Sequence, residues 1–487
     1  MHDGDSRGGT VTDDDTASAS DPHESKIDSR AGRPVTRLFR SGRTSRWLLP
    51  AGLAAVAGGA GIALGGGPTT SLVTLQLAIG LLVVVIVVTL DFRRDTQLPV
   101  LMRPGTAIVV SFLVGSVSAP ALSRADYTAY LTMWSALAAG IVLGLLITQS
   151  AVGSGSKEQI GFDPRRTANL SLIVIAISMV SALIFFAWQG VPALQSNIEQ
   201  ARVDAAAAGT GYVRLLAYIG LVGVQGLFAI RHRLASPSLL IVTAIILAMG
   251  NRSPLLYLYI PVAFVLFDQK RIKVTAPRIV LSVLVLLAVI ASIGVYRVFS
   301  QSQFASYAEY RSAIASRDYA AVALTSLTHY ADVIPENAVL TKHLVDDGKL
   351  EHKYGATYLT LFISALPGQQ LSLDREIKQV SGAQFIGGGT PPTLMGEGYV
   401  NFGLPGTILS GAFIVWLSRY WSRRYASTTT SGQTPLSALT ASTYGYIICW
   451  VVGSPVAGLA GASTVPLAGA ILLITIRHLS FRKQAHT

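Results

Sequence analysis

The sequence predicts an all-α membrane protein with about twelve transmembrane helices and one large extracytoplasmic loop. Its composition, its apolar runs and the position of its basic residues carry this prediction. Of the 487 residues, 51% are hydrophobic and only 13% are charged, whereas soluble domains carry about 25% charged residues. The net charge of +12 does not indicate nucleic-acid binding, because Lys and Arg cluster between apolar runs as they do in membrane proteins.

The apolar runs approach the length of about 20 residues that a helix needs to cross a bilayer. There are twelve of them: 47–66, 71–90, 104–122, 128–148, 168–188, 212–230, 234–250, 253–267, 278–296, 404–421, 436–453 and 461–478. We expect 234–250 and 253–267 to be two short helices joined by a tight outer turn. No internal repeat of the kind found in many transporters is visible.

The basic clusters precede the first run or follow an even-numbered one. They are Arg33–Arg46, Arg93–Arg94, Lys157–Arg166, Arg231–Arg233, Lys270–Lys273, Arg419–Arg424 and Arg477–Lys483. The positive-inside rule therefore places both termini in the cytoplasm. The predicted order is a disordered cytoplasmic tail (1–46), nine helices (47–296), the extracytoplasmic loop (297–402), three helices (403–480) and a cytoplasmic tail (481–487).

The extracytoplasmic loop has eight Lys or Arg and ten Asp or Glu, so it lacks the basic bias of the inner loops. A helix is predicted from Pro335 and Glu336 through Val345. The apolar stretch Tyr354–Leu366 is too short to cross a bilayer, so we expect it on the membrane surface or packed on the outer helix ends. Glycines and prolines at 387–392 predict an irregular turn.

Metal, nucleotide and disulfide chemistry find no support in the sequence. The single cysteine, Cys449, lies in an apolar run and excludes a disulfide within one chain. No HExxH, DxD, Walker or GxGxxG pattern occurs in a useful place, so we expect no metal and no cofactor.

Four arginines are candidate substrate-binding residues. Arg252 lies in the tight turn at the membrane boundary, and Arg202 lies in a second outer loop. A guanidinium binds phosphate bidentately, which suits a diphosphate. The alternatives are a snorkelling side chain at Arg252 and a solvated loop charge at Arg202. Arg297 and Arg311 begin the large loop, and membrane anchoring is the alternative role for both.

The end of the large loop holds the candidate catalytic group. Glu397 lies between two glycines and could act as general base for a sugar hydroxyl, or it could cap a helix N-terminus or pair with an Arg. Tyr399 and Asn401 could bind sugar, with interfacial anchoring as the alternative. His329 and His343 are further candidates, although a lone His is more often structural.

Several motifs together carry a family resemblance. They are the outer loop with Gly190, Pro192 and Arg202, the Gly250–Ser253 turn, Tyr354–Tyr358 leading to Pro367, and Gly387–Pro392 with Gly396–Gly403. With these motifs the chain resembles the O-antigen polymerase (Wzy-type) family of oligosaccharide repeat-unit polymerases, over roughly 185–415 in motif and the whole chain in topology. Gly368 departs from the family, where a basic residue is expected after the loop proline.

The resemblance implies a helical membrane fold related to the O-antigen ligases and GT-C type glycosyltransferases. It implies that oligosaccharide units on undecaprenyl diphosphate are joined at the outer face of the cytoplasmic membrane, with lipid diphosphate leaving. Arg252 and Arg202 match the diphosphate contacts. Glu397 is the first choice of base, with His329 or His343 in reserve. Implied partners are the lipid-linked oligosaccharide (donor and acceptor), membrane lipids, and a chain-length regulator and flippase of the same pathway.

Two alternatives stay open. A ligase that moves a finished glycan to another acceptor would share the donor chemistry. A flippase or transporter of the lipid-linked unit would also suit twelve helices. A transporter is expected to hold ionisable residues near the middle of the membrane, whereas here nearly all lie at its boundaries.

Overall fold

A computed structural model gives the fold. It describes residues 68–92, 103–114, 122–148, 162–195, 211–250, 253–271, 276–300, 308–363, 372–383, 389–429 and 435–481. The chain divides into two units, Met1–Arg46 and Trp47–Thr487, and all described residues belong to the second. The predicted tail 1–46 and the apolar run 47–66 lie outside the described residues.

The described residues form helices and no strand, which confirms the all-α prediction for them. The helices are α2 (Pro68–Phe92), α3 (Pro104–Val114), α4 (Arg124–Ile147), α5 (Pro164–Gln189), η2 (Pro192–Leu194), α7 (Gly211–Tyr218), α8 (Gly220–Ala229), α9 (Ala235–Ala248), α10 (Ser253–Asp268), α11 (Ala276–Ser300), α12 (Ala308–Ala315), α13 (Tyr319–Asp346), α14 (Ala356–Ile363), α15 (Leu373–Ser381), α16 (Thr393–Thr429) and α17 (Pro435–Leu479). The two predicted short helices are present, because α9 ends at Ala248 and α10 begins at Ser253, whereas residues 251 and 252 between them lie outside the described residues.

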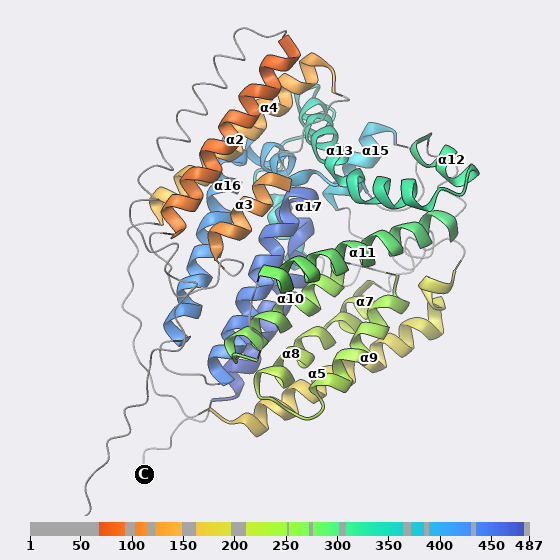
Figure 1. The fold of residues 1–487 in the computed structure, drawn as a ribbon, viewed down its shortest axis with the longest axis vertical. Helices are drawn as coiled ribbons and strands as arrows, with labels where there is room; N and C mark the ends of the chain where they lie inside the picture. Colours follow the sequence, from red (N-terminus) through yellow and green to blue (C-terminus); the bar gives the residue numbers. More distant parts are fainter. Residues whose placement is uncertain are drawn as a thin grey trace, which may run out of the picture. The chain divides into compact units, whose positions relative to one another are not determined.

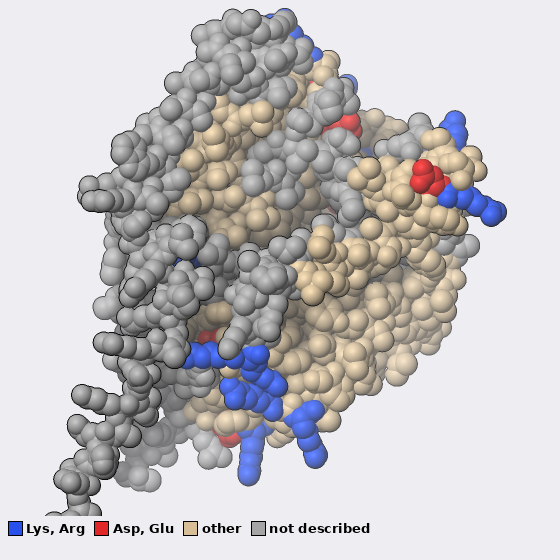
Figure 2. Space-filling view, viewed as in Figure 1, with Lys and Arg blue, Asp and Glu red and all other residues tan. Residues whose placement is uncertain are grey.

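Among the described residues, five helical segments are long and apolar enough to cross a membrane. They are α4, α5 with η2, α7 with α8, α16 and α17, and three shorter apolar helices lie within α2, α9 and α10. Figure 2 shows a broad area without charged residues on the face viewed, between a group of mainly Lys and Arg at the lower end and charges of both signs at the upper right. The protein is therefore a multi-pass membrane protein.

Helix α17 is a hairpin of two antiparallel segments. Its chain reverses at Gly458, which has φ +78° and ψ 173°. An added Cβ at Gly453 would contact Ala462, and one at Gly469 would lie 2.6 Å from the ring of Tyr446. Contacts between residues so far apart in sequence require the second segment to run back along the first. The two segments match the predicted runs 436–453 and 461–478.

Helices α4 and α16 pack closely and run in the same direction. A Cβ at Gly140 would lie 2.0 Å from the Ile408 carbonyl oxygen, so only glycine allows this approach. Further along both helices, Arg419 donates to the Leu145 carbonyl and to Thr148 Oγ1, each at 3.0 Å. The predicted topology requires this relative direction, because both runs end in a basic cluster.

Two prolines inside helices leave backbone carbonyls without their usual donor within the helix. Side chains of other helices donate hydrogen bonds to these two carbonyls. A proline removes the N–H that would bond the carbonyl four residues earlier, and an unbonded carbonyl is costly inside a membrane. For Pro261 that carbonyl belongs to Tyr257, and Gln225 Nε2 donates to it at 3.0 Å. For Pro455 it belongs to Val451, which accepts from Ser111 Oγ at 2.9 Å.

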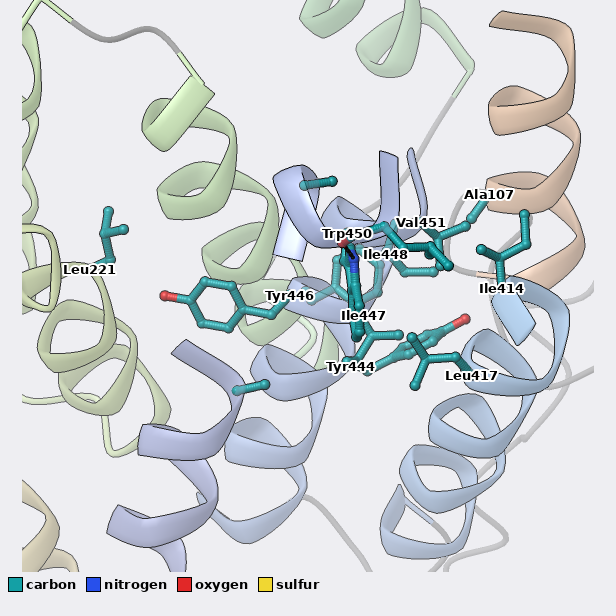
Figure 3. Packing of buried hydrophobic residues seen from close by; sticks show 14 of the residues in the cluster. Ala107, Leu221, Ile414, Leu417, Tyr444, Tyr446, Ile447, Ile448, Trp450 and Val451 are labelled. Atoms are coloured by element: carbon teal, nitrogen blue, oxygen red, sulfur yellow. Dashed lines mark hydrogen bonds between the residues drawn. The ribbon is translucent and has the colours of Figure 1, made fainter. Parts of the chain in front are cut away.

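The core is centred on the first segment of α17, which lies between α16 and α10 (Figure 1). Figure 3 shows Tyr446 pointing toward the side of Leu221 in α8, whereas Val451 points toward the side of Ala107 in α3 and Ile414 in α16. Tyr444 stacks on Tyr425 with ring centroids 6.0 Å apart. Helix α17 therefore packs on α8 as well as on α3 and α16.

The predicted extracytoplasmic loop contains α12 to α15. The helix predicted to begin at Pro335 is too short, because α13 begins at Tyr319 and holds Pro335 in its interior. The N-terminal signal lies at Asp318, whose side chain accepts from the Ala321 N–H at 2.9 Å. Helix α14 packs on α16 and α17, which is one of the two placements expected for Tyr354–Leu366.

Candidate functional site

The Gly396–Gly403 motif forms a sharp corner in α16. Phe402 and Gly403 leave the helical conformation, and Gly403 has φ +66°. Thr407 Oγ1 donates to the Met395 carbonyl at 3.1 Å, so the residues before the corner fold back along those after it. The helix begins at Thr393 rather than at the predicted 404, because the motif itself is helical.

Glu397 is enclosed at the meeting point of α14, α16 and α17. Its side chain is 1% exposed. Thr357 Oγ1 donates to its Oε1 at 3.0 Å, and the Ala460 N–H lies 3.1 Å from its Oε2 and 3.3 Å from its Oε1. Among the described residues, no Lys or Arg forms an ion pair with it.

Ala460 belongs to the first turn of the second segment of α17, directly after the break at Gly458. The positive end of a helix favours a carboxylate at this position. A Cβ at Gly458 would lie 2.4 Å from Glu397 Oε2, so glycine is required both for the turn and for the approach of the carboxylate. Of the roles left open by the sequence, this geometry supports helix capping.

Asn401 completes the network one turn after Glu397. Its Nδ2 donates to Thr357 Oγ1 at 2.6 Å and to the Glu397 carbonyl at 2.9 Å. Its Oδ1 accepts from the Gly355 N–H at 2.8 Å. Asn401 is fully buried, and these bonds hold the start of α14 against the corner of α16 instead of offering the amide to a ligand.

His343 lies in a different cluster, on the last turn of α13. Its Nε2 is 2.8 Å from Asp126 Oδ1, and its side chain is 47% exposed. Asp126 is also bonded to Ser123 Oγ at 2.7 Å at the start of α4. A carboxylate that orients a solvent-accessible imidazole is the arrangement found in general bases.

Tyr399 connects the same turn of α13 to α16. Its hydroxyl donates to Asp346 Oδ1 at 2.6 Å, and Lys342 Nζ lies 5.4 Å from the centre of its ring. Lys342 also forms an ion pair with Asp346. Tyr399 therefore connects α13 to α16, the helix that also carries Glu397 and Asn401.

Among the residues that the structure describes, none of the remaining candidate residues is found in these clusters. Arg202 and Arg252 lie outside the described residues, as do the side chains of Arg297 in α11 and His329 in α13. Arg311 lies on α12 and is exposed, in a part of the chain that packs on α13. In the described part of the chain, no group of three His, Cys, Asp or Glu could hold a metal ion.

A cavity of about 640 Å³ lies beside the Glu397 network, among α4, α14, α16 and α17. Tyr358, which follows Thr357, and Ala460, which binds Glu397, are part of its wall. Trp416, Trp450 and Phe413 supply aromatic surface.

The sequence did not indicate every group in these clusters. Thr357 lies within a motif that supported the family resemblance, although no role was assigned to it. The Ala460 N–H could not be predicted, because its availability depends on the break at Gly458. Asp126 could be found only through a contact between residues 217 positions apart.

A family described as "Putative O-antigen polymerase" matches residues 73–329, which is more than half of the chain. The match confirms the resemblance inferred from the motifs. It includes the Gly250–Ser253 turn and ends before the Gly396–Gly403 motif. Comparison with curated proteins gives no match, and comparison with solved structures gives none either.

Proposed function

Because the chain belongs to the O-antigen polymerase family, we propose that it joins oligosaccharide repeat units carried on undecaprenyl diphosphate at the outer face of the cytoplasmic membrane. The family match is the observation that carries this proposal. The apolar helices support it, because a substrate with a polyprenyl chain resides in a membrane. The same reasoning makes the protein a glycosyltransferase.

In the proposed reaction, a hydroxyl at the non-reducing end of one lipid-linked unit attacks the anomeric carbon of a growing chain. The bond from that carbon to the lipid diphosphate breaks, and the diphosphate leaves with the bonding electron pair. The hydroxyl proton passes to a base. Arg252 and Arg202 are the proposed diphosphate contacts, because guanidinium groups bind phosphate bidentately.

For the base, the geometry favours His343 over Glu397. Both oxygens of Glu397 accept hydrogen bonds from the protein, and its side chain is 1% exposed. His343 is 47% exposed and is oriented by Asp126. We therefore assign proton transfer to His343 and the joining of α14, α16 and α17 to Glu397.

The test is to incubate purified protein with a lipid-diphosphate oligosaccharide from its host, and to separate the products by size. A ladder at repeat-unit spacing is expected. Transfer of a single unit to an added lipid or wall acceptor, without a ladder, would support a ligase instead. Movement of the intact substrate across proteoliposomes without a new glycosidic bond would support a flippase.

A further inference from the structure

We propose that the cavity among α4, α14, α16 and α17 binds the polyisoprenoid chain of the lipid-linked substrate, with its diphosphate end near Tyr358 and Ala460. This inference rests on the proposed function and assigns a place to the lipid part of that substrate. The volume of about 640 Å³ lies in the range of sites that enclose small ligands. It would hold a segment of a long chain.

The wall of the cavity is mostly apolar, and several of its polar side chains already donate hydrogen bonds within the protein. Trp450 Nε1 donates to the Leu459 carbonyl at 2.8 Å, and Ser463 Oγ donates to the Ala460 carbonyl at 2.6 Å. Thr148 Oγ1 donates to the Gly144 carbonyl at 2.6 Å. Because these polar groups are bonded within the protein, a sugar would lose its hydrogen bonds to water here without replacing them. An apolar chain would lose none.

Part of the cavity wall is exposed at the surface of the protein. Leu409 is 57% exposed, Trp416 46% and Ile147 61%, and all three belong to its wall. They lie on α4 and α16, which are apolar enough to cross the membrane. A lipid chain could therefore enter sideways from the bilayer, without passing through water.

The orientation of the lipid chain follows from the residues that lie at each end of the cavity. Gly144, Ile147 and Thr148 lie at the end of α4, where Arg419 and Arg423 donate to its last carbonyls. Tyr358, Phe402 and Ala460 lie at the other end of the cavity, beside Glu397 and the segment that contains α12 to α15. Among the described residues, the second end adjoins the segment from α12 to α15, which the predicted topology places outside the membrane. In the proposed reaction the diphosphate therefore belongs at this end, and the chain extends along α16.

The occupant is an isoprenoid chain rather than a phospholipid acyl chain for a reason of location. A phospholipid has no part in the proposed reaction, whereas the donor must bring its diphosphate to this end of the helices. The aromatic rings of Phe413, Trp416 and Trp450 give broad apolar surfaces against which a branched, unsaturated chain can pack.

The experiment uses the full-length protein in nanodiscs and a polyprenyl diphosphate with a diazirine in its chain. After illumination, mass spectrometry should find the adducts on wall residues of α4, α16 and α17. Unlabelled undecaprenyl phosphate should compete at least tenfold better than phosphatidylglycerol at the same concentration. Adducts confined to other helices, or equal competition by phosphatidylglycerol, would overturn the assignment.

A matched pair of variants sharpens the test. Leu409→Trp fills the cavity and should reduce labelling at least fivefold. Leu183→Trp changes an equally apolar residue on α5, 66% exposed and outside the wall, and should label within twofold of wild type. Both should elute from gel filtration as wild type does. Wild-type labelling of a folded Leu409→Trp protein would contradict the proposal.

The ladder assay on the same preparations separates the two proposals. A wild-type ladder with adducts elsewhere would reject the cavity as the chain site and leave the polymerase function standing. Adducts in the cavity without any ladder would reject the function and retain the polyprenyl site.

Discussion

At the scale of single residues, Glu397 and His343 differ in their surroundings, since Glu397 is buried and His343 is 47% exposed. Glu397 bonds to two parts of the chain that are far from it in sequence, at Thr357 and Ala460, and His343 faces solvent beside a carboxylate. Replacing each should therefore affect different quantities.

Glu397→Gln keeps the shape of the side chain and one strong acceptor oxygen. It should lower stability by about 1–3 kcal/mol, because a charge-assisted hydrogen bond is weakened in a buried place. Polymerisation by the folded fraction should stay within a few-fold of wild type. Thermal unfolding in detergent together with the ladder assay checks both. A folded Glu397→Gln protein with turnover reduced a hundredfold would restore Glu397 as the base.

His343→Gln should give the opposite result. Loss of a general base lowers turnover by about 10²–10⁴-fold, whereas an exposed side chain contributes little to stability. Asp126→Asn should reduce turnover less, because the imidazole remains but loses its orienting carboxylate. Single-turnover kinetics with a defined donor and acceptor measures these changes. Unchanged turnover in His343→Gln would remove His343 from the proton transfer.

At the scale of helices, Pro261 in α10 and Pro455 in α17 are compatible with membrane crossing because side chains of neighbouring helices donate to the freed carbonyls. Gln225 serves Pro261 in this way, and Ser442 Oγ in turn donates to Gln225 Oε1 at 3.0 Å. The side-chain bond and the proline should therefore be coupled energetically.

A double-mutant cycle tests this coupling. Gln225→Leu should destabilise the wild type by about 1–2 kcal/mol, because the Tyr257 carbonyl loses its donor. In a Pro261→Ala background the restored N–H can bond that carbonyl, so Gln225→Leu should cost less. Unfolding midpoints of the four proteins in one detergent give the coupling energy. Equal costs in both backgrounds would show that the bond does not compensate for the proline.

At the scale of the whole molecule, the segment from α12 to α15 is attached to α16 through charged and polar contacts on the last turn of α13. Burial opposes ionisation of Asp346, but hydrogen bonds from Lys342 and Tyr399 outweigh it and hold the pKa of this carboxyl below its usual value. A lowered pKa stabilises the attachment above the unfolded-state pKa of about 4, and this contribution is lost as pH falls below it.

Hydrogen exchange of α13 should therefore increase as the pH falls below about 4, after correction for the intrinsic rate. Asp346→Asn should show faster exchange at neutral pH and a weaker dependence on acid. Exchange in α5, which is distant in sequence and apolar, serves as the internal control. A wild-type α13 whose exchange does not respond to acid would show that Asp346 does not hold the segment.

How far the sequence predicts this molecule differs between its parts. Apolar runs predicted helices, because the length that crosses a bilayer is fixed by its thickness. Twelve crossings were predicted, and five helical segments among the described residues are long and apolar enough to cross. The start of α13 at Tyr319, capped by Asp318, was missed, because Pro335 resembles an N-terminal signal. The roles of Glu397 and His343 could not be separated by sequence, because both depend on partners distant in the chain, Ala460 and Asp126.

In the proposed reaction, a hydroxyl of one lipid-linked unit attacks the anomeric carbon of another. A substrate whose acceptor hydroxyl is blocked tests this reaction most directly. Purified protein would receive a lipid-diphosphate repeat unit whose acceptor hydroxyl is methylated, so that it can donate but cannot accept. Alone it should give no ladder. Mixed with unblocked units it should give a ladder in which blocked chains carry a single methylated unit at the non-reducing end. A ladder from the blocked unit alone, or release of lipid diphosphate without any glycan joining, would contradict the account.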